Sequence, residues 1–164
     1  MKMIAAVDKN WAIGNKGGLL AHVSGDMKFF RTKTTGNVVV LGRKTLATFP
    51  GGKPLKDREN IVITTNRDYD AQGAAVVCSV EELLEYVKKY DSDSVYIIGG
   101  GTVYKQFLEY CDTAYITKFN KEYDADTYID NLDEKDEWEL TEESETFEEK
   151  GIEYKFCTCI RKNK

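Results

Sequence analysis

The chain has 164 residues, 41% of them hydrophobic, a length that suits one compact domain over residues 1–164 rather than two ordinary domains. The formal net charge of -5 provides no general electrostatic attraction to nucleic acid or to an anionic membrane, so we expect neither as a partner. The apolar run at residues 3–7 is too short for a signal peptide or a spanning helix, which favours a cytoplasmic protein.

Strands and helices alternate along the first two thirds of the chain. Continuous apolar runs of strand length are typical of a sheet covered on both faces. Ser79, with Glu82 three residues later, is a capping box that opens one of the helices. This order predicts an α/β domain with a largely parallel sheet and ligands at the carboxyl ends of its strands. We expect strands at 3–7, 38–41, 61–63 and 95–98, and helices at 26–33, 79–89 and 102–110.

The last third of the chain predicts an antiparallel end to this sheet. Residues 115–119 have a strand pattern, and residues 138–140 and 154–160 alternate apolar and polar, with Gly151 in their connection. We therefore expect a C-terminal antiparallel hairpin that makes the sheet mixed. The ten carboxylates between Asp133 and Glu149 lack the spacing of a calcium loop, so we interpret them as a solvated face.

Cysteine and histidine usage argues against a metal site. The four cysteines, at 78, 111, 157 and 159, contain no Cys-x-x-Cys pair, and His22 is the only histidine. Cys157 and Cys159 would point to one face of a strand, where a disulfide requires local distortion. We expect buried free thiols, reducing surroundings and no bound metal.

Three strand ends carry groups that suit phosphates. Gly99-Gly100-Gly101 joins a strand to a helix start, where the backbone can approach an anion closely, although a tight turn also needs glycines for packing. Gly42-Arg43-Lys44-Thr45 and Thr64-Thr65-Asn66-Arg67 place cations, hydroxyls and an amide at two more strand ends. Each segment alone can be an ordinary surface loop. Since parallel strands end at one edge, the three together favour a dinucleotide.

Asp26 is the acid that we single out. It follows Gly25 at a helix start, and most aspartates there are N-cap or first-turn residues. If the face that carries Met27 and Phe30 lines a cavity, Asp26 becomes a partly buried acid that can hold a ligand's nitrogen cation or amide. These residues alone leave both interpretations open.

Segments along the whole chain, in this order and spacing, resemble the bacterial dihydrofolate reductases. They are residues 4–8, 13–14, 26–30, 40–45, 58–60, 98–104, 115–117 and 124–127 and the closing hairpin. The resemblance implies an eight-stranded, mainly parallel, twisted sheet flanked by about four helices. It also implies a monomeric enzyme of one-carbon metabolism that reduces 7,8-dihydrofolate to 5,6,7,8-tetrahydrofolate with NADPH and binds antifolate-type inhibitors.

For the substrate, the resemblance makes Asp26 the catalytic residue, which holds the 2-amino group and N3 of the pterin while a water delivers the proton to N5. Thr117 would share the hydrogen-bond network behind Asp26, and Arg58 would bind the α-carboxylate of the glutamate tail. The other implied substrate contacts are Ile4, Ala6, Met27, Phe30, Phe49 and Ile98.

For NADPH, the resemblance places the pyrophosphate at Gly99–Val103 and the helix start Arg43–Thr45, the nicotinamide at Ala6, Ile13, Gly14 and Tyr104, and the 2′-phosphate at Arg43, Thr65, Asn66 and Arg67. The full implied set is Ala6, Ile13, Gly14, Gly42, Arg43, Lys44, Thr45, Thr64, Thr65, Asn66, Arg67, Gly99, Gly100, Gly101, Thr102, Val103 and Tyr104. Thr102 stands where many relatives carry arginine, which weakens the preference for NADPH over NADH.

The segment Asn15–Ser24 would be a mobile loop that closes over the nicotinamide. Many relatives carry a proline and a tryptophan where this chain has Leu20-Ala21-His22, so one wall of the pocket is reduced. Two alternatives stay open. One is a reductase of the same fold for another heterocycle, against which Asp26 with Arg58 discriminates; the other is a folate- or nucleotide-binding protein without turnover.

Overall fold

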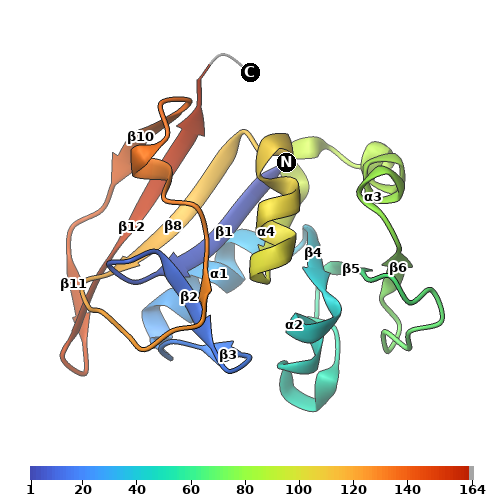
Figure 1. Cartoon of the computed structure of the whole chain (residues 1–164), viewed down its shortest axis with the longest axis horizontal. Coiled ribbons are helices and arrows are strands. Elements are labelled where there is room, and N and C mark those ends of the chain that lie inside the picture. Colours follow the sequence, from blue (N-terminus) through green and yellow to red (C-terminus); the bar gives the residue numbers. More distant parts are fainter. Residues whose placement is uncertain (163–164) are drawn as a thin grey trace.

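A computed structural model describes residues 1–162 and shows a mixed sheet flanked by four α-helices (Figure 1). Eight strands follow one another in the order β10-β12-β8-β1-β7-β4-β5-β6, which confirms the expected eight-stranded mixed sheet, and β11 pairs with β12 as an addition. The central strands pair in parallel, while β12 is antiparallel to β8, β10 and β11. The strands are β1 (Lys2–Val7), β4 (Val38–Gly42), β5 (Glu59–Ile63), β6 (Ala75–Val77), β7 (Val95–Gly99), β8 (Thr113–Phe119), β10 (Trp138–Glu143), β11 (Phe147–Glu149) and β12 (Ile152–Arg161).

The apolar strands are buried on both faces. In β4, Val38 and Val40 belong to one core cluster, and Val39 and Leu41 belong to another. β7 divides its side chains between the same two clusters in the same alternating way. Because successive side chains of a strand point to opposite faces, a continuous apolar run is what such a sheet requires.

The helices cover the two faces in pairs. Leu83 and Phe107, from α3 and α4, pack into the cluster of one face, while Phe30 and Leu46, from α1 and α2, pack into the cluster of the other. The α-helices are α1 (Ser24–Thr34), α2 (Arg43–Ala47), α3 (Val80–Tyr86) and α4 (Gly101–Phe107); short 3-10 helices span Pro50–Gly52, Val87–Lys89, Ser92–Ser94, Leu108–Tyr110 and Leu132–Glu134. No helix among residues 1–162 combines the length and apolar character needed to cross a membrane.

The predicted helices are confirmed with small changes at their ends. α3 and α4 each continue into a 3-10 turn, which together account for the predicted spans 79–89 and 102–110. The Ser79 hydroxyl accepts a hydrogen bond from Glu82 N at 3.0 Å, as a capping box requires. The Glu82 carboxylate, however, accepts from Cys78 N at 3.3 Å rather than from Ser79 N.

The end of the sheet differs from the predicted two-stranded hairpin. β11 comes between β10 and β12 along the chain. Gly151 joins β11 to β12 in a turn where Lys150 and Gly151 have φ of 52° and 81°. These positive φ values match the twist of a two-residue hairpin. Cys157 and Cys159 are buried and form no disulfide, as expected, and burial raises the pKa of Cys159 to about 11. Cys111 is also buried, and Cys78 is half-buried.

A second, small sheet was not predicted. It consists of β2 (Ala12–Asn15), β3 (Gly18–Leu19) and β9 (Thr127–Tyr128) in the order β3-β2-β9, all antiparallel. The first half of the expected loop Asn15–Ser24 is therefore a short hairpin, and Ser24 is already the first residue of α1. In the view of Figure 1 this sheet lies at the lower left of the molecule, and α2 lies at the lower right.

Candidate active site

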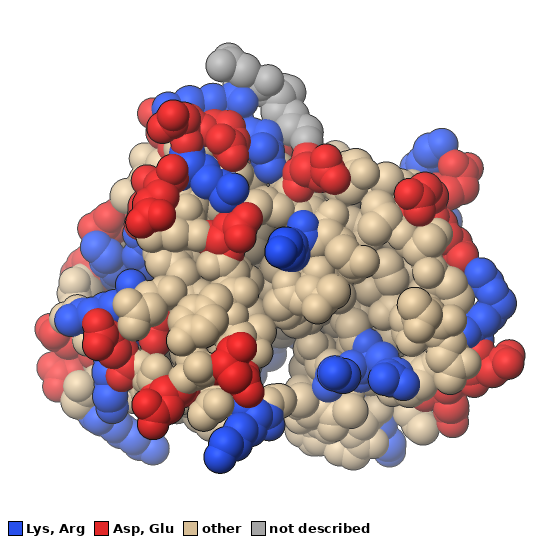
Figure 2. Space-filling model, in the orientation of Figure 1, with Lys and Arg blue, Asp and Glu red and all other residues tan. Residues whose placement is uncertain are grey.

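A notch in the molecular surface separates the part that carries β3 from the part that carries α2 (Figure 2). β1, β7, β4 and β5 are parallel, so their carboxyl ends share this edge of the sheet. Ala6, Gly42 and Gly99 lie at those ends. The predicted phosphate junctions and the predicted pterin contacts are thereby brought to one region.

Asp26 lies in the first turn of α1 and is not its N-cap, which is Val23. The side chain is half-buried, and this burial raises the pKa of the Asp26 carboxyl above its ordinary value of 3.8. A hydrogen bond with the Thr117 hydroxyl favours the ionised form and opposes that rise. Thr117 is 1% exposed and lies opposite Ala6 in the pairing of β8 with β1. Asp26 is therefore both a first-turn residue and a partly buried acid.

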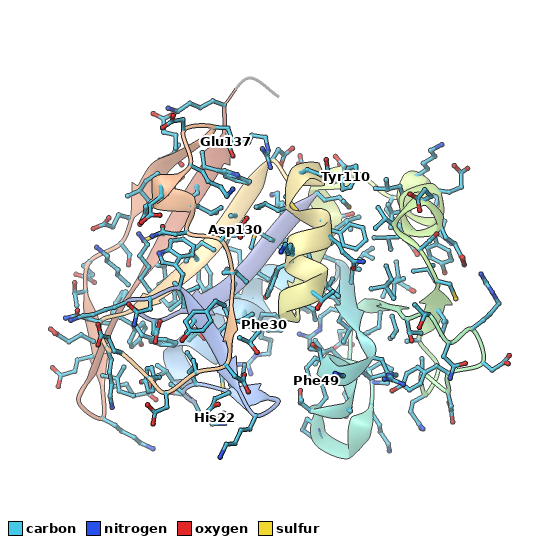
Figure 3. The ribbon with its side chains drawn as sticks, in the orientation of Figure 1. His22, Phe30, Phe49, Tyr110, Asp130 and Glu137 are labelled. Atoms are coloured by element: carbon cyan, nitrogen blue, oxygen red, sulfur yellow. The ribbon has the colours of Figure 1, made fainter. Side chains whose placement is uncertain are left out.

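Aromatic and aliphatic side chains surround this acid. Ile4 and Ile98 belong to one buried cluster, against which Phe30 and Phe49 pack from α1 and from the turn after α2 (Figure 3). Met27, which sequence reasoning placed with them, is 51% exposed and outside the core clusters. The cleft is thus apolar on the sheet side and open beside Met27.

Tyr104 connects the acid to the glycine turn. Its hydroxyl donates to Ile4 O at 2.6 Å, so the phenol is fixed by the backbone of β1. Burial and the nearby Asp26 both raise the pKa of Tyr104, which keeps the phenol neutral. The edge of its ring would lie 3.8 Å from a Cβ placed on Gly99.

Arg58 is held at the end of the cleft formed by α1. Its Nη1 donates to Thr34 Oγ1 at 3.1 Å and its Nε to Lys56 O at 2.8 Å. Burial lowers the pKa of Arg58, the negative charge of Asp57 opposes this, and the positive charge of Arg31 lowers the pKa further. A guanidinium in this place suits an anionic ligand group. Sequence reasoning missed Arg31, because only the fold brings α1 beside the start of β5.

The three positions of the predicted phosphate turn require glycine for different structural reasons. Gly99 has φ of 136°, a conformation that disfavours any side chain. A Cβ on Gly100 would lie 3.3 Å from Thr45 Oγ1, and one on Gly101 would lie 2.7 Å from Thr127 Cγ2. The turn therefore packs closely against α2 on one side and β9 on the other. Packing alone explains Gly101, whereas Gly99 is required by the backbone itself.

The expected 2′-phosphate residues divide into two groups. Arg43 and Thr65 are exposed, and so is Lys44 of the expected pyrophosphate site; neither Arg43 nor Lys44 forms an ion pair within residues 1–162. Arg67 instead makes a bidentate pair with Glu82, with N–O distances of 2.9 and 3.1 Å, and this hydrogen bonding raises the pKa of Arg67. Neighbouring polar groups are also engaged, since Asn66 Oδ1 accepts from Asp68 N and Thr64 Oγ1 accepts from Asn66 N.

Two carboxylates far away in sequence hold the segment between β2 and α1. Asp126 Oδ2 accepts from Lys16 N at 2.9 Å, and Glu149 accepts from the first residues of α1. His22, within the segment, is exposed (Figure 3). No local pattern signals these contacts, because each joins residues more than 100 positions apart.

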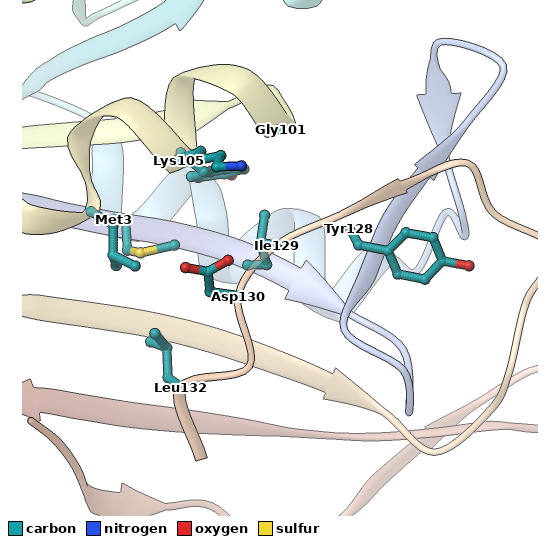
Figure 4. A pocket seen from close by; sticks show the side chains of 9 residues that line it. Met3, Gly101, Lys105, Tyr128, Ile129, Asp130 and Leu132 are labelled. Carbon is teal, nitrogen blue, oxygen red and sulfur yellow. The ribbon is translucent and has the colours of Figure 1, made fainter. Parts of the chain in front are cut away.

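A cavity of about 120 Å³ lies between α4 and residues 128–132 on the sheet face opposite α1, and Gly101 and Tyr104 of the expected NADPH set help to line it (Figure 4). Met3, Lys105, Ile129 and Asp130 are among its lining residues, whereas Asp26 and Arg58 are not. Across residues 1–162, no group of three or more His, Cys, Asp or Glu side chains could hold a metal ion.

Comparison with known proteins agrees with this geometry. The family model for dihydrofolate reductase matches residues 1–161. The chain is 33% identical to dihydrofolate reductase of Bacillus subtilis (strain 168), with 99% of this chain and 95% of that protein covered. It is 35% identical to the Schistosoma mansoni enzyme of the same name, covering 96% and 94%.

A solved structure is similar over the same extent. Dihydrofolate reductase from Enterococcus faecalis, complexed with NADP(H) and RAB-propyl, superposes with a TM-score of 0.89 at 34% identity, covering 99% of this chain and 96% of that chain. The matches extend over nearly the entire sequence and over the whole described fold. The chain therefore belongs to the dihydrofolate reductase family.

Proposed function

We propose that this protein reduces 7,8-dihydrofolate to 5,6,7,8-tetrahydrofolate with NADPH, and that Asp26 is its catalytic residue. The observation that carries the proposal is the half-buried Asp26 in the first turn of α1, hydrogen-bonded to Thr117, with Phe30 of the same helix packed against the apolar cluster of the sheet. The likeness to the Enterococcus faecalis structure in complex with NADP(H) supports the choice of cofactor.

Asp26 acts through its surroundings. Burial makes the free carboxylate unfavourable, so a ligand that offers two N–H donors recovers what desolvation takes away. The 2-amino group and N3 of a pterin are such a pair. We propose that the ionised Asp26 holds and polarises this end of the ring, while a water delivers the proton to N5 at the other end. Ile4, Ala6, Met27, Phe30, Phe49 and Ile98 would exclude other water from the ring.

The residues present suit NADPH. The glycine turn Gly99–Gly101 places no side chain between β7 and Thr45, and the exposed Arg43 and Lys44 form no ion pair with any residue of the described range 1–162. When bound, the cofactor supplies the hydride that reduces C6 of the pterin. We propose that Ala6, Ile13, Gly14 and Tyr104 position the nicotinamide, and that Gly42–Thr45 and Gly99–Val103 bind the phosphates.

Preference for NADPH over NADH would rest on few groups. Arg43 and Thr65 remain available for a 2′-phosphate, whereas Arg67 is neutralised by Glu82 and Thr102 brings no charge. We propose that Arg43 carries most of the discrimination. At the other end of the cleft, Arg58 would bind the α-carboxylate of the substrate's glutamate tail, with Arg31 adding positive charge.

We also propose a monomer in which residues 1–164 form one domain, working in the cytoplasm without nucleic acid or membrane partners. A binding protein without turnover is the second candidate. Met27 is exposed, and Leu20-Ala21-His22 lacks the large ring that many relatives carry there, so the cleft is more open. Either protein would bind dihydrofolate and antifolate-type inhibitors, so binding alone does not separate the two.

Loss of nicotinamide absorbance on mixing the purified protein with dihydrofolate and NADPH tests the function, with NADH run in parallel. We expect NADPH to be oxidised in step with the appearance of tetrahydrofolate, and NADH to be oxidised more slowly. Quenching of protein fluorescence by folate without any oxidation of NADPH would overturn the enzymatic proposal and favour the binding protein.

A further inference from the structure

Helix α1, which carries Asp26, begins without a cap of its own. Its N-cap is Val23, which is 1% exposed and offers no side-chain acceptor. The first helical hydrogen bond runs from Met27 N to Val23 O at 3.0 Å. The N–H groups of Ser24, Gly25 and Asp26 therefore have no acceptor within the helix, as at any helix start.

Glu149 supplies the missing acceptors from the end of β11. Its Oε2 accepts from Ser24 N at 2.8 Å, and its Oε1 accepts from Ser24 Oγ at 2.5 Å and from Gly25 N at 3.3 Å. These hydrogen bonds lower the pKa of the Glu149 carboxyl and keep it ionised, and the bond from the Ser24 hydroxyl has the largest effect. A carboxylate at the positive end of a helix is also favoured by the helix dipole.

The hairpin that carries Glu149 is fixed against α1. β11 pairs with β12, and the tight turn at Lys150 and Gly151 sets their register. The hydroxyl of Tyr154, in β12, occupies the space where a side chain on residue 25 would begin, so Gly25 permits this contact. Burial first, and then the negative charges of Glu149 and Asp26, raise the pKa of Tyr154.

We propose that Glu149 is a positioning residue for Asp26, acting as the N-terminal cap of α1 from the β11–β12 hairpin and thereby setting where Asp26 meets Thr117. Glu149 itself does not reach the substrate in this arrangement. Moving the first turn of α1 moves Asp26, because Asp26 follows directly after the two residues that Glu149 holds. The inference rests on the proposed role of Asp26 as the acid that binds the pterin.

The test compares Glu149→Gln with Glu148→Gln in the full chain. Glutamine keeps the shape of the side chain at position 149, but its NH2 group is a donor and would face the N–H donors of the helix. The side chain of Glu148 is exposed and forms no hydrogen bond or ion pair among residues 1–162. We expect Glu149→Gln to raise KM for dihydrofolate about fivefold, equivalent to about 1 kcal/mol. KM for NADPH should change less than about twofold, and Glu148→Gln should change neither constant.

A substrate without a glutamate tail sharpens the result. If Glu149 acts through Asp26 and not through Arg58, the rise in KM should persist with a reduced pteridine that lacks the tail. Equal increases in KM for dihydrofolate and in KM for NADPH would overturn the inference, since they indicate general loosening. No difference between Glu149→Gln and Glu148→Gln would also overturn it, since it indicates that Glu149 has no role.

A milder variant covers the case in which Glu149→Gln folds poorly. Ser24→Ala removes only the hydroxyl contact to Glu149 and should raise KM for dihydrofolate about twofold, with faster hydrogen exchange at Gly25 N. Unchanged exchange and unchanged KM in Ser24→Ala would contradict the capping role. Asp26→Asn separates this inference from its foundation: if that variant is inactive while Glu149→Gln behaves like Glu148→Gln, only the positioning role fails.

Discussion

The two walls of the cleft manage charge in different ways. On the wall formed by α1, one carboxylate is half-buried beside apolar rings, and burial shifts its pKa. On the wall formed by α2 and the segment after β5, cations are exposed to solvent, and hydrogen bonding to Glu82, rather than burial, raises the pKa of Arg67. A single buried charge is sensitive to position, whereas exposed cations act through their number.

Of the variants that test this difference between the two walls, Asp26→Asn should have the largest effect. Asparagine keeps the size of the side chain but cannot carry the negative charge that pairs with the pterin. We expect kcat/KM for dihydrofolate to fall at least about a hundredfold at neutral pH. Affinity for NADPH, measured by fluorescence titration, should stay unchanged. Full turnover in this variant would show that the α1 wall has another catalytic group.

Arg58→Lys should give the next largest effect. Lysine retains a charge but loses the planar pair of donors, and it cannot hold Thr34 and Lys56 in the same way. We expect KM for dihydrofolate to rise about tenfold, or about 1.4 kcal/mol. KM for a reduced pteridine without a glutamate tail is the matched control and should not move. A rise with both substrates would place Arg58 in the support of α1 instead of the tail site.

Arg43→Ala and Arg67→Ala are a matched pair on the cofactor wall. Arg43 has no ion-pair partner within residues 1–162, so its loss should raise KM for NADPH about fivefold and leave KM for NADH nearly unchanged. Arg67 is already paired with Glu82, so its loss should change KM for NADPH less than about twofold. The reverse order of the two effects would show that Glu82 releases Arg67 when the cofactor binds.

The smallest expected effect is on thermal stability. Asp26→Asn should make the protein more stable although it makes the protein less active. Because burial raises the pKa of Asp26, the folded state favours its protonated form, and this contribution is lost as pH rises above the ordinary value of 3.8 and through the raised one. Asp26→Asn should therefore raise Tm by a few degrees at pH 7 and by less at pH 4. Thermal unfolding at the two pH values measures this, and an equal shift at both would mean that charge burial is not the cause.

Sequence patterns predicted the central strands because those strands are buried on both faces and leave a continuous apolar run. They missed β3 and β9, which have only two residues each and so no periodicity to detect. β6 and β11 were missed for the same reason, at three residues each. β2, with four residues, was also missed, because its sequence Ala-Ile-Gly-Asn has no alternating pattern.

In the candidate site, too, some residues could be predicted from the sequence and others could not. Residues at strand ends and on α1 could be named from the chain, because glycines, cations and a singular acid stand out locally. The pairing of Arg67 with Glu82 and the contact of Glu149 with Ser24 could not, since they depend on how distant elements pack. The exposure of Met27 likewise follows from the shape of the cleft.

The place of β1 in the sheet has a consequence for how the chain reaches this structure. β1 is the first strand in the sequence but lies between β7 and β8, which begin at residues 95 and 113. At about 5–20 residues per second, roughly 90 residues of further synthesis leave this apolar strand unpaired for about 5–20 seconds. The nascent chain must therefore shield its most central strand before any native neighbour exists, and a ribosome-bound fragment that stops short of residue 95 has nothing to place beside it.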